Sequence, residues 1–166
     1  MRKVQPHHIV IQLGSVELQK ANKLAISRND KPPTVNKKFD TTQSDYTIHY
    51  IAALAEVAWE KYSGWEVDTE QKNGDGGTDF IANGRTYQLK TRNVTNFCNP
   101  DLLVETDKIN ADRYFLSEVD LERPTEVVFI GWCTKDEIMK ETIDVGHGPR
   151  YVRRRYLLRK MPKGVM

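Results

Sequence analysis

Three polar side chains, those of Asp79, Gln88 and Lys90, occur in a pattern that is suited to the hydrolysis of a phosphodiester. Between them stands the dipeptide Asn83-Gly84, which is typical of a two-residue type I′ hairpin because both positions of that turn require positive φ. We expect the two flanking segments to pair as strands. Gln88 and Lys90 are two residues apart, so their side chains lie on one face of the second strand. A carboxylate, an amide and an ammonium group would then share one site.

This set of groups suits a hard divalent cation, which prefers oxygen ligands. Asp79 offers a carboxylate, Gln88 an amide oxygen and Leu89, between the two polar residues, a main-chain carbonyl. Lys90 can stabilise the charge that develops on the phosphorus centre or help to deprotonate a water. The alternative is an ordinary exposed hairpin with solvated charges.

A further carboxylate comes from the segment before the hairpin, where the apolar spacing of residues 45–62 predicts a helix. Glu56 stands there among alanines and Val57, and small residues allow a helix to lie close to a sheet. A carboxylate in such a place is costly unless it is ion-paired or bound to a metal. Both possibilities stay open from the helix alone, and Glu60, one turn later, is the second candidate.

The spacing of Asp79, Gln88 and Lys90 resembles the core motif of the PD-(D/E)XK nuclease superfamily, whose fold is that of restriction endonucleases. In that motif an Asp on one strand precedes a Glu/Asp/Gln-x-Lys triplet on the next. The glycine-rich lead-in to Asp79 resembles small prokaryotic and phage nucleases. Two departures are present: Gln88 replaces an acidic residue, and a threonine stands before Asp79 where the motif has proline. The similarity spans roughly residues 45–160.

The resemblance implies a site in which Mg²⁺ or Mn²⁺ is held by Asp79, Glu56, Gln88 and the carbonyl of Leu89. In this family a helix before the core hairpin often supplies such an acidic ligand, and Glu56 occupies that place. Asp79, Gln88, Lys90 and Glu56 would be the catalytic residues. The resemblance also makes DNA the expected substrate, and the enzyme an endo- or exodeoxyribonuclease.

Positive charge gathers at the end of the chain, although the formal net charge of the whole chain is only +2. No acidic residue follows position 149, whereas arginines are frequent there. Such a segment favours contact with a phosphate backbone, and a solvated edge strand defended by charge is the alternative. The residues expected to contact nucleic acid are Arg92, Arg153, Arg154 and Arg155.

The composition, with 39% hydrophobic and 29% charged residues, allows one core in a chain of 166 residues, so we expect a single domain over 1–166. The fold class expected is α/β: a central mixed β-sheet flanked by helices, as in restriction endonucleases. The domain would comprise an N-terminal helix and loop (1–43), a catalytic core (44–134) and a C-terminal helix with a basic tail (135–166). Strands are predicted over 65–69, 78–82, 85–91, 102–104, 111–119 and 125–132, and a C-terminal helix over 135–141.

The two cysteines, Cys98 and Cys133, have no metal-binding spacing, and neither a signal peptide nor a run of about 20 apolar residues occurs. We therefore expect a protein of the cytoplasm, in a prokaryote or a phage-infected host cell, without membrane contact. One site per chain makes a homodimer attractive for cutting two strands.

The sequence thus predicts a metal-dependent nuclease. Two other classes of protein remain. The first is a nucleic-acid-binding module that keeps the fold but binds metal weakly, which the neutral Gln88 favours. The second is a structural subunit whose basic tail binds a protein partner.

Overall fold

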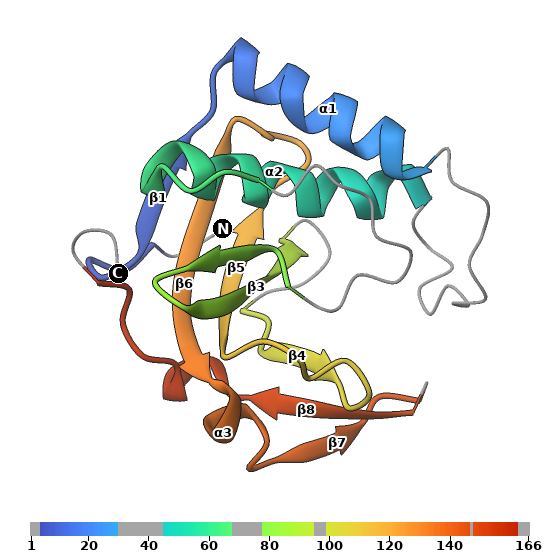
Figure 1. Cartoon of the computed structure of the whole chain (residues 1–166), viewed down its shortest axis with the longest axis vertical. Helices are drawn as coiled ribbons and strands as arrows, with labels where there is room; N and C mark the ends of the chain where they lie inside the picture. The colour runs from blue at the N-terminus through green and yellow to red at the C-terminus, as the bar shows by residue number, and fades with distance from the viewer. Residues whose placement is uncertain (1–3, 30–44, 68–77, 95–98, 147, 163–166) are drawn as a thin grey trace.

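A computed structural model of the chain describes residues 4–29, 45–67, 78–94, 99–146 and 148–162. Two long helices follow the first strand and precede all the other strands (Figure 1). In chain order the elements are β1 (Ile9–Gln12), α1 (Ser15–Asn29), α2 (Asp45–Ser63), β2 (Phe80–Ala82), β3 (Arg85–Asn93), β4 (Leu102–Glu105), β5 (Arg113–Val119), β6 (Glu126–Thr134), α3 (Lys135–Ile138), β7 (Thr142–Asp144), β8 (Pro149–Arg153) and a single 3₁₀ turn, η1 (Arg155–Leu157).

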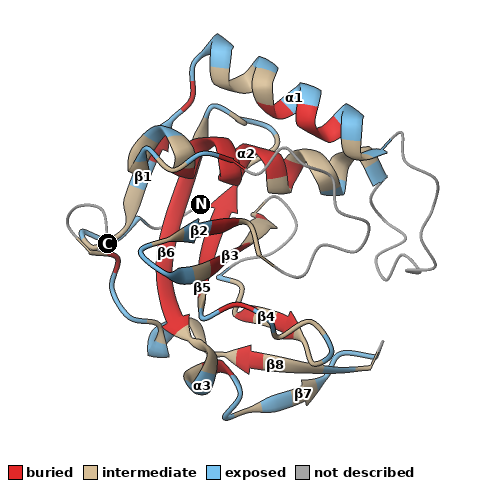
Figure 2. Cartoon of the chain, viewed as in Figure 1, coloured by how far each residue is buried: buried red, intermediate tan, exposed pale blue. Residues whose placement is uncertain are grey.

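The larger sheet has five strands in the order β1-β6-β5-β3-β2. Strands β3 and β5 are parallel, and the other neighbouring pairs are antiparallel, so the sheet is mixed as the sequence predicts. Its central strands β5 and β6 are buried along almost their whole length (Figure 2). Strands buried on both faces have apolar residues without alternation, and the run from Val127 to Trp132 has this character.

Helices α1 and α2 cover one face of this sheet (Figure 1). Helix α2 contacts β1, β3, β5 and β6, and α1 packs on α2. The apolar spacing of α2 predicts a buried stripe of Ile51, Leu54, Ala55, Ala58 and Tyr62. The first four are buried, Tyr62 is partly buried against the same core, and Trp59 joins them there.

The opposite face carries a second sheet, with strand order β4-β8-β7, and the one-turn helix α3. Its core contains Leu102 and Val104 of β4 packed with Tyr114 and Leu116 of β5. The mixed sheet has flanking helices as predicted, but on this face a small antiparallel sheet that the sequence did not predict lies beside the short helix α3.

The C-terminal region also differs from its prediction. The helix expected over 135–141 is a single turn, which begins at a capping box between Thr134 and Glu137 and ends at Ile138. The basic segment forms a strand but not the edge strand of the alternative prediction, because β8 is the central strand of the small sheet and pairs with both β4 and β7. The strand expected over 65–69 is absent from its described part, residues 65–67.

Candidate active site

The hairpin at Asn83-Gly84 forms as predicted and sets the geometry of the site. Asn83 and Gly84 have φ of 51° and 70°, the positive values that a type I′ turn requires. Phe80 pairs with Tyr87 at the last register position of β2 and β3. Asp79 directly precedes β2, and it makes hydrogen bonds with Tyr87 and Leu89, the two neighbours of Gln88 on β3. The hairpin therefore brings the first and second residues of the predicted motif to the same end of β3.

The Asp79 carboxylate is fixed on the edge of β3. The main-chain N–H of Asp79 donates to the carbonyl of Tyr87 (2.8 Å), and the main-chain N–H of Leu89 donates to Oδ2 of Asp79 (2.7 Å). In a strand, the N–H and C=O of one residue point to the same edge. The carbonyl of Leu89 therefore points to the edge on which the Asp79 carboxylate lies, so these two oxygen donors are neighbours.

Gln88 contributes an oxygen that lacks a partner. Its side chain is only 5% exposed, and Oε1 is buried without a hydrogen bond to any described residue. A buried acceptor left unsatisfied costs about 1–3 kcal/mol. In native folds, an acceptor in this position commonly contacts a bound ion or an ordered water.

Lys90 and Arg92 lie on the same face of β3 as Gln88. Tyr87 and Leu89 pack in the core beneath the helices, so the alternation of the strand turns Gln88, Lys90 and Arg92 toward the other face. Arg92 lines a pocket there together with residues of the small sheet, which agrees with this orientation. The motif residues of β3 thus lie on the side of the sheet that faces away from α2.

Glu56 has a different environment from the one that the resemblance implies. It is 5% exposed, and the Arg28 guanidinium of α1 contacts both of its carboxylate oxygens, at 3.0 and 2.7 Å. A bidentate pair of this kind satisfies a buried carboxylate. The ion-paired alternative for Glu56 is therefore the one seen, and α1 supplies the partner. Arg28 had not been identified from the sequence, although a basic residue in the last turn of a helix is a common feature.

Glu60, the second candidate on α2, is also engaged away from the hairpin. Its carboxylate accepts hydrogen bonds from the Lys20 ammonium at 2.6 and 2.8 Å and from the main-chain N–H of Val67 at 3.1 Å. This arrangement ties α1, α2 and the segment after α2 together, which is a structural role.

The oxygen donors that the hairpin assembles fit a hard divalent cation. They are a carboxylate (Asp79), a main-chain carbonyl (Leu89) and an amide oxygen without a partner (Gln88), with no sulfur or nitrogen donor among them. Within the described parts of the chain, no three His, Cys, Asp or Glu side chains gather as a metal-binding group. The set therefore has one anionic ligand, and Asp75 of the glycine-rich turn lies outside the described residues.

The arginines of the C-terminal region make internal ion pairs. Arg154 contacts Asp101 at 3.2 Å and Glu141 at 2.6 Å, and Arg155 pairs with Glu118, whose side chain is 2% exposed. Asp101 and Glu118 lie far away from their arginines in the sequence, and Glu118 falls in a buried strand where no acid was expected to have a role. Arg154 connects the residues that precede β4 and β7 within the small sheet, whereas Arg155 connects the small-sheet region to β5. Contact of Arg154 and Arg155 with nucleic acid stays a prediction.

Arg153 differs from the two arginines that follow it. Its Nε is buried and has no hydrogen-bond partner among the described residues. Arg153 ends β8, opposite Leu102 of β4. Its contact with nucleic acid stays a prediction.

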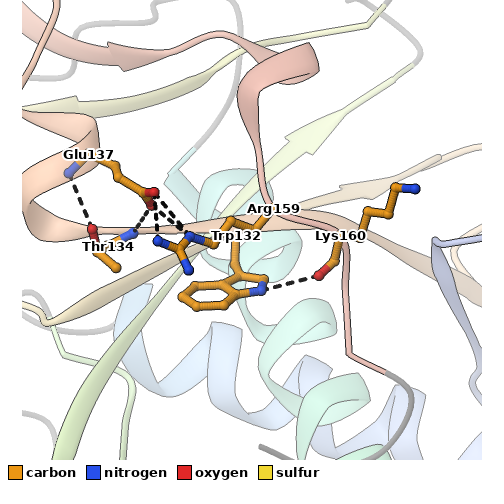
Figure 3. Close-up of polar contacts among 5 residues, drawn as sticks. All are labelled: Trp132, Thr134, Glu137, Arg159 and Lys160. Atoms are coloured by element: carbon orange, nitrogen blue, oxygen red, sulfur yellow. Dashed lines mark hydrogen bonds and ion pairs between the residues drawn. The ribbon is translucent and has the colours of Figure 1, made fainter.

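The C-terminal segment around Arg159 and Lys160 contacts β6 at Trp132 (Figure 3). Arg159 stacks on the indole ring at 5.0 Å from its centroid, and Arg113 also lies over that ring, at 4.6 Å. The Trp132 indole N–H donates to the carbonyl of Lys160 at 3.2 Å, and the Arg159 guanidinium donates to Glu137. The Arg159 guanidinium holds the pKa of the Glu137 carboxyl below its ordinary value. This contact orders the tail without using a residue of the hairpin.

No protein-family model matches the chain, and searches of curated proteins and of solved structures found no significant match. The resemblance to the PD-(D/E)XK superfamily therefore rests on the sequence motifs described above. Among the described residues, no helix is long and apolar enough to cross a membrane.

Proposed function

We propose that this protein is a metal-dependent nuclease that hydrolyses phosphodiester bonds in DNA at the end of the β2–β3 hairpin. The observation that supports the proposal is that Oε1 of Gln88 is buried without a partner among the described residues, on the residue before Leu89, whose N–H holds the Asp79 carboxylate. An ordinary exposed hairpin offers no reason to bury an amide oxygen in this way, because the unsatisfied acceptor destabilises the fold.

In this proposal Asp79, the Leu89 carbonyl and Gln88 hold Mg²⁺ or Mn²⁺, which when bound would supply the Lewis acid for phosphodiester hydrolysis. The Leu89 N–H orients the Asp79 carboxylate through its 2.7 Å hydrogen bond. Lys90, on the same strand face as Gln88, stabilises the negative charge of the pentavalent transition state. Glu56 is not part of this proposed site, because it is ion-paired with Arg28 and α2 lies on the other side of the sheet from Gln88 and Lys90.

The test uses variants that separate charge from structure. Asp79→Asn keeps an oxygen that can accept from the Leu89 N–H but removes the anionic ligand, so cleavage should be lost and Mn²⁺ affinity should fall by more than the roughly 10- to 100-fold typical of an outer-shell change. Lys90→Ala should abolish cleavage while Mn²⁺ affinity holds or rises, because a neighbouring positive charge is removed. Asp107→Ala and Lys108→Ala, two neighbours in the turn after β4, are the matched controls and should behave as the parent.

The measurements are calorimetric titration of Mn²⁺ and cleavage of supercoiled, linear, single-stranded and branched DNA with Mg²⁺, Mn²⁺ or EDTA. Gln88→Glu adds a second anionic ligand, so Mn²⁺ affinity should increase if Oε1 faces the cation. The metal centre is wrong if Asp79→Asn and Gln88→Glu both bind Mn²⁺ as the parent does. Equal cleavage in EDTA would exclude the metal mechanism.

A nucleic-acid-binding module without catalysis is the second candidate, and the Arg28–Glu56 ion pair favours it because that pair removes an acid from the implied ligand set. This candidate expects DNA binding that does not change with EDTA and no cleavage with either metal. Cleavage that requires Mg²⁺ or Mn²⁺ and is abolished by EDTA separates the two functions.

A further inference from the structure

A pocket of about 220 Å³ lies on the face of β3 that carries the motif residues. Arg92 of β3 forms one wall, Leu103 of β4 and Ile143 of β7 form another, and Pro100 and Asp101 complete the lining. The pocket therefore lies where the five-stranded sheet meets the small sheet. Three of the five lining residues are apolar, and the two polar ones carry opposite charges.

The volume of the pocket limits its ligand to one ring system. Drug-sized molecules occupy sites of about 300–1,000 Å³, whereas a cavity of about 150 Å³ already holds benzene. A pocket of about 220 Å³ lies between these values, so it is large enough for a single nucleobase and too small for a dinucleotide. Aliphatic walls suit the flat faces of a base that has left its stack.

The polar groups of the pocket are held in place by the fold. Oδ1 of Asp101 accepts from the main-chain N–H of Arg155 at 2.7 Å, and Oδ2 accepts from Arg154 at 3.2 Å. A carboxylate has about four lone-pair sites, so each oxygen can still accept from an exocyclic amino group of a base. Arg92 has five N–H donors, which allows it to contact a phosphate while keeping other contacts.

The pocket lies near the candidate active site along β3. Arg92 follows Lys90 by two residues on the same face of β3, a spacing of about 6.6 Å. A strand of DNA whose phosphate lies at Lys90 therefore has a neighbouring nucleotide within reach of Arg92. Bases of an intact duplex are stacked and paired, so only an unpaired or flipped base can enter a pocket beside the backbone.

We propose that this pocket binds one unstacked nucleobase next to the scissile phosphate, so that the preferred DNA substrate has single-stranded character at the cleavage point. The inference rests on the proposed function for the position of the phosphate. The base pocket itself can be tested by measuring DNA binding without metal and without cleavage.

The experiment uses the full chain in EDTA at low salt and a short duplex with a single-stranded tail. 2-Aminopurine is placed at each tail position in turn, and in a parallel series each nucleotide is replaced by an abasic residue. Loss of a base–side-chain contact costs about 1–3 kcal/mol, so removal of the seated base should weaken binding by about fivefold or more at one position only. The 2-aminopurine fluorescence should change most at that same position.

Leu103→Trp fills the pocket with a larger side chain and should abolish the position dependence, whereas Leu157→Trp, on the exposed 3₁₀ turn, should preserve it. The abasic series uses the unaltered protein, so it decides the question even if Leu103→Trp misfolds. Three results would overturn the pocket. The first is a DNA affinity that does not depend on the position of the abasic residue, the second is a position dependence that remains in folded Leu103→Trp, and the third is no binding of DNA at all.

Cleavage with Mn²⁺ is measured separately, so that the two proposals fail independently. Cleavage combined with a flat abasic series refutes the base pocket alone. The opposite result is also possible: DNA affinity depends on one abasic position, Leu103→Trp removes that dependence, and no metal condition gives cleavage. This result supports the pocket and refutes the nuclease.

Discussion

The ion pair between Arg155 and Glu118 gives the sharpest test of the role of the C-terminal arginines. Glu118 lies on the central strand β5 and is 1% exposed as a residue, and the Arg155 guanidinium is itself mostly buried, with 18% of its side chain accessible. Removal of one partner of such a pair leaves a charge in a poorly solvated place and typically costs about 3–5 kcal/mol. Arg155→Met removes the charge but keeps most of the aliphatic stem, so the loss reports the ion pair rather than packing.

We expect Arg155→Met to lower the free energy of unfolding by about 3 kcal/mol, which for a domain of this size lowers Tm by roughly 6–12 °C. Urea denaturation followed by tryptophan fluorescence measures the change. Arg159→Met is the matched control. The Arg159 side chain is 52% exposed, so loss of its pair with Glu137 and of its stacking on Trp132 should cost much less than the loss of the buried Arg155 pair.

The double variant Glu118→Gln with Arg155→Met should recover much of the stability, because no unpaired charge is then buried. A loss below about 1 kcal/mol in Arg155→Met, or a loss equal to that of Arg159→Met, would refute the structural role. In that case Arg155 would be available for DNA, and its removal should instead flatten the salt dependence of DNA binding.

Two other changes test the core and the tail. Burial, and then the charge of Arg28, lower the pKa of His49, whereas the charge of Asp45 acts in the opposite direction. His49 therefore binds a proton more readily in the unfolded chain than in the folded protein. Stability should therefore fall as the pH is lowered through about 6.5, the ordinary pKa of histidine, and His49→Phe should remove this slope in urea titrations between about pH 5.5 and 7.5. A Cβ added at Gly131 would lie 2.7 Å from the carbonyl oxygen of Arg159. Gly131→Ala should therefore weaken the contact of the C-terminal segment with β6 and speed amide hydrogen exchange in that segment. Unchanged exchange would contradict this contact.

The parts of the fold that local sequence patterns govern were predictable. Asn83-Gly84 requires a particular turn, and the apolar stripe of α2 requires one buried face, so the hairpin and the helix follow from a few neighbouring residues. The apolar run of β6 likewise identifies a central strand. Each of these predictions depends on residues that are close together in the chain.

The features that the sequence did not reveal depend on distant partners. Arg155 and Glu118 are 37 positions apart, and Arg154 and Asp101 are 53 apart, so the arginines at the end of the chain resemble a free basic arm until the fold brings acids to them. Strand β8 begins with a proline and carries arginines, which hides a strand that is central to its sheet. The environment of Glu56 also depends on a distant partner. Its ion-pair partner Arg28 lies on α1, a helix that was not part of the metal hypothesis.

The pairing of β1 with β6 has a consequence for how the protein is made. Ile9 pairs with Phe129, so the first strand of the large sheet has to wait for its partner during synthesis. At about 5–20 residues per second, the ribosome adds the intervening stretch of about 120 residues in roughly 6–24 seconds. Through that interval Ile11 and Leu13, which are buried in the finished protein, have no sheet to join. The nascent chain can pair α1 with α2 early, but its first strand stays accessible to chaperones and to other nascent chains until the second half has emerged.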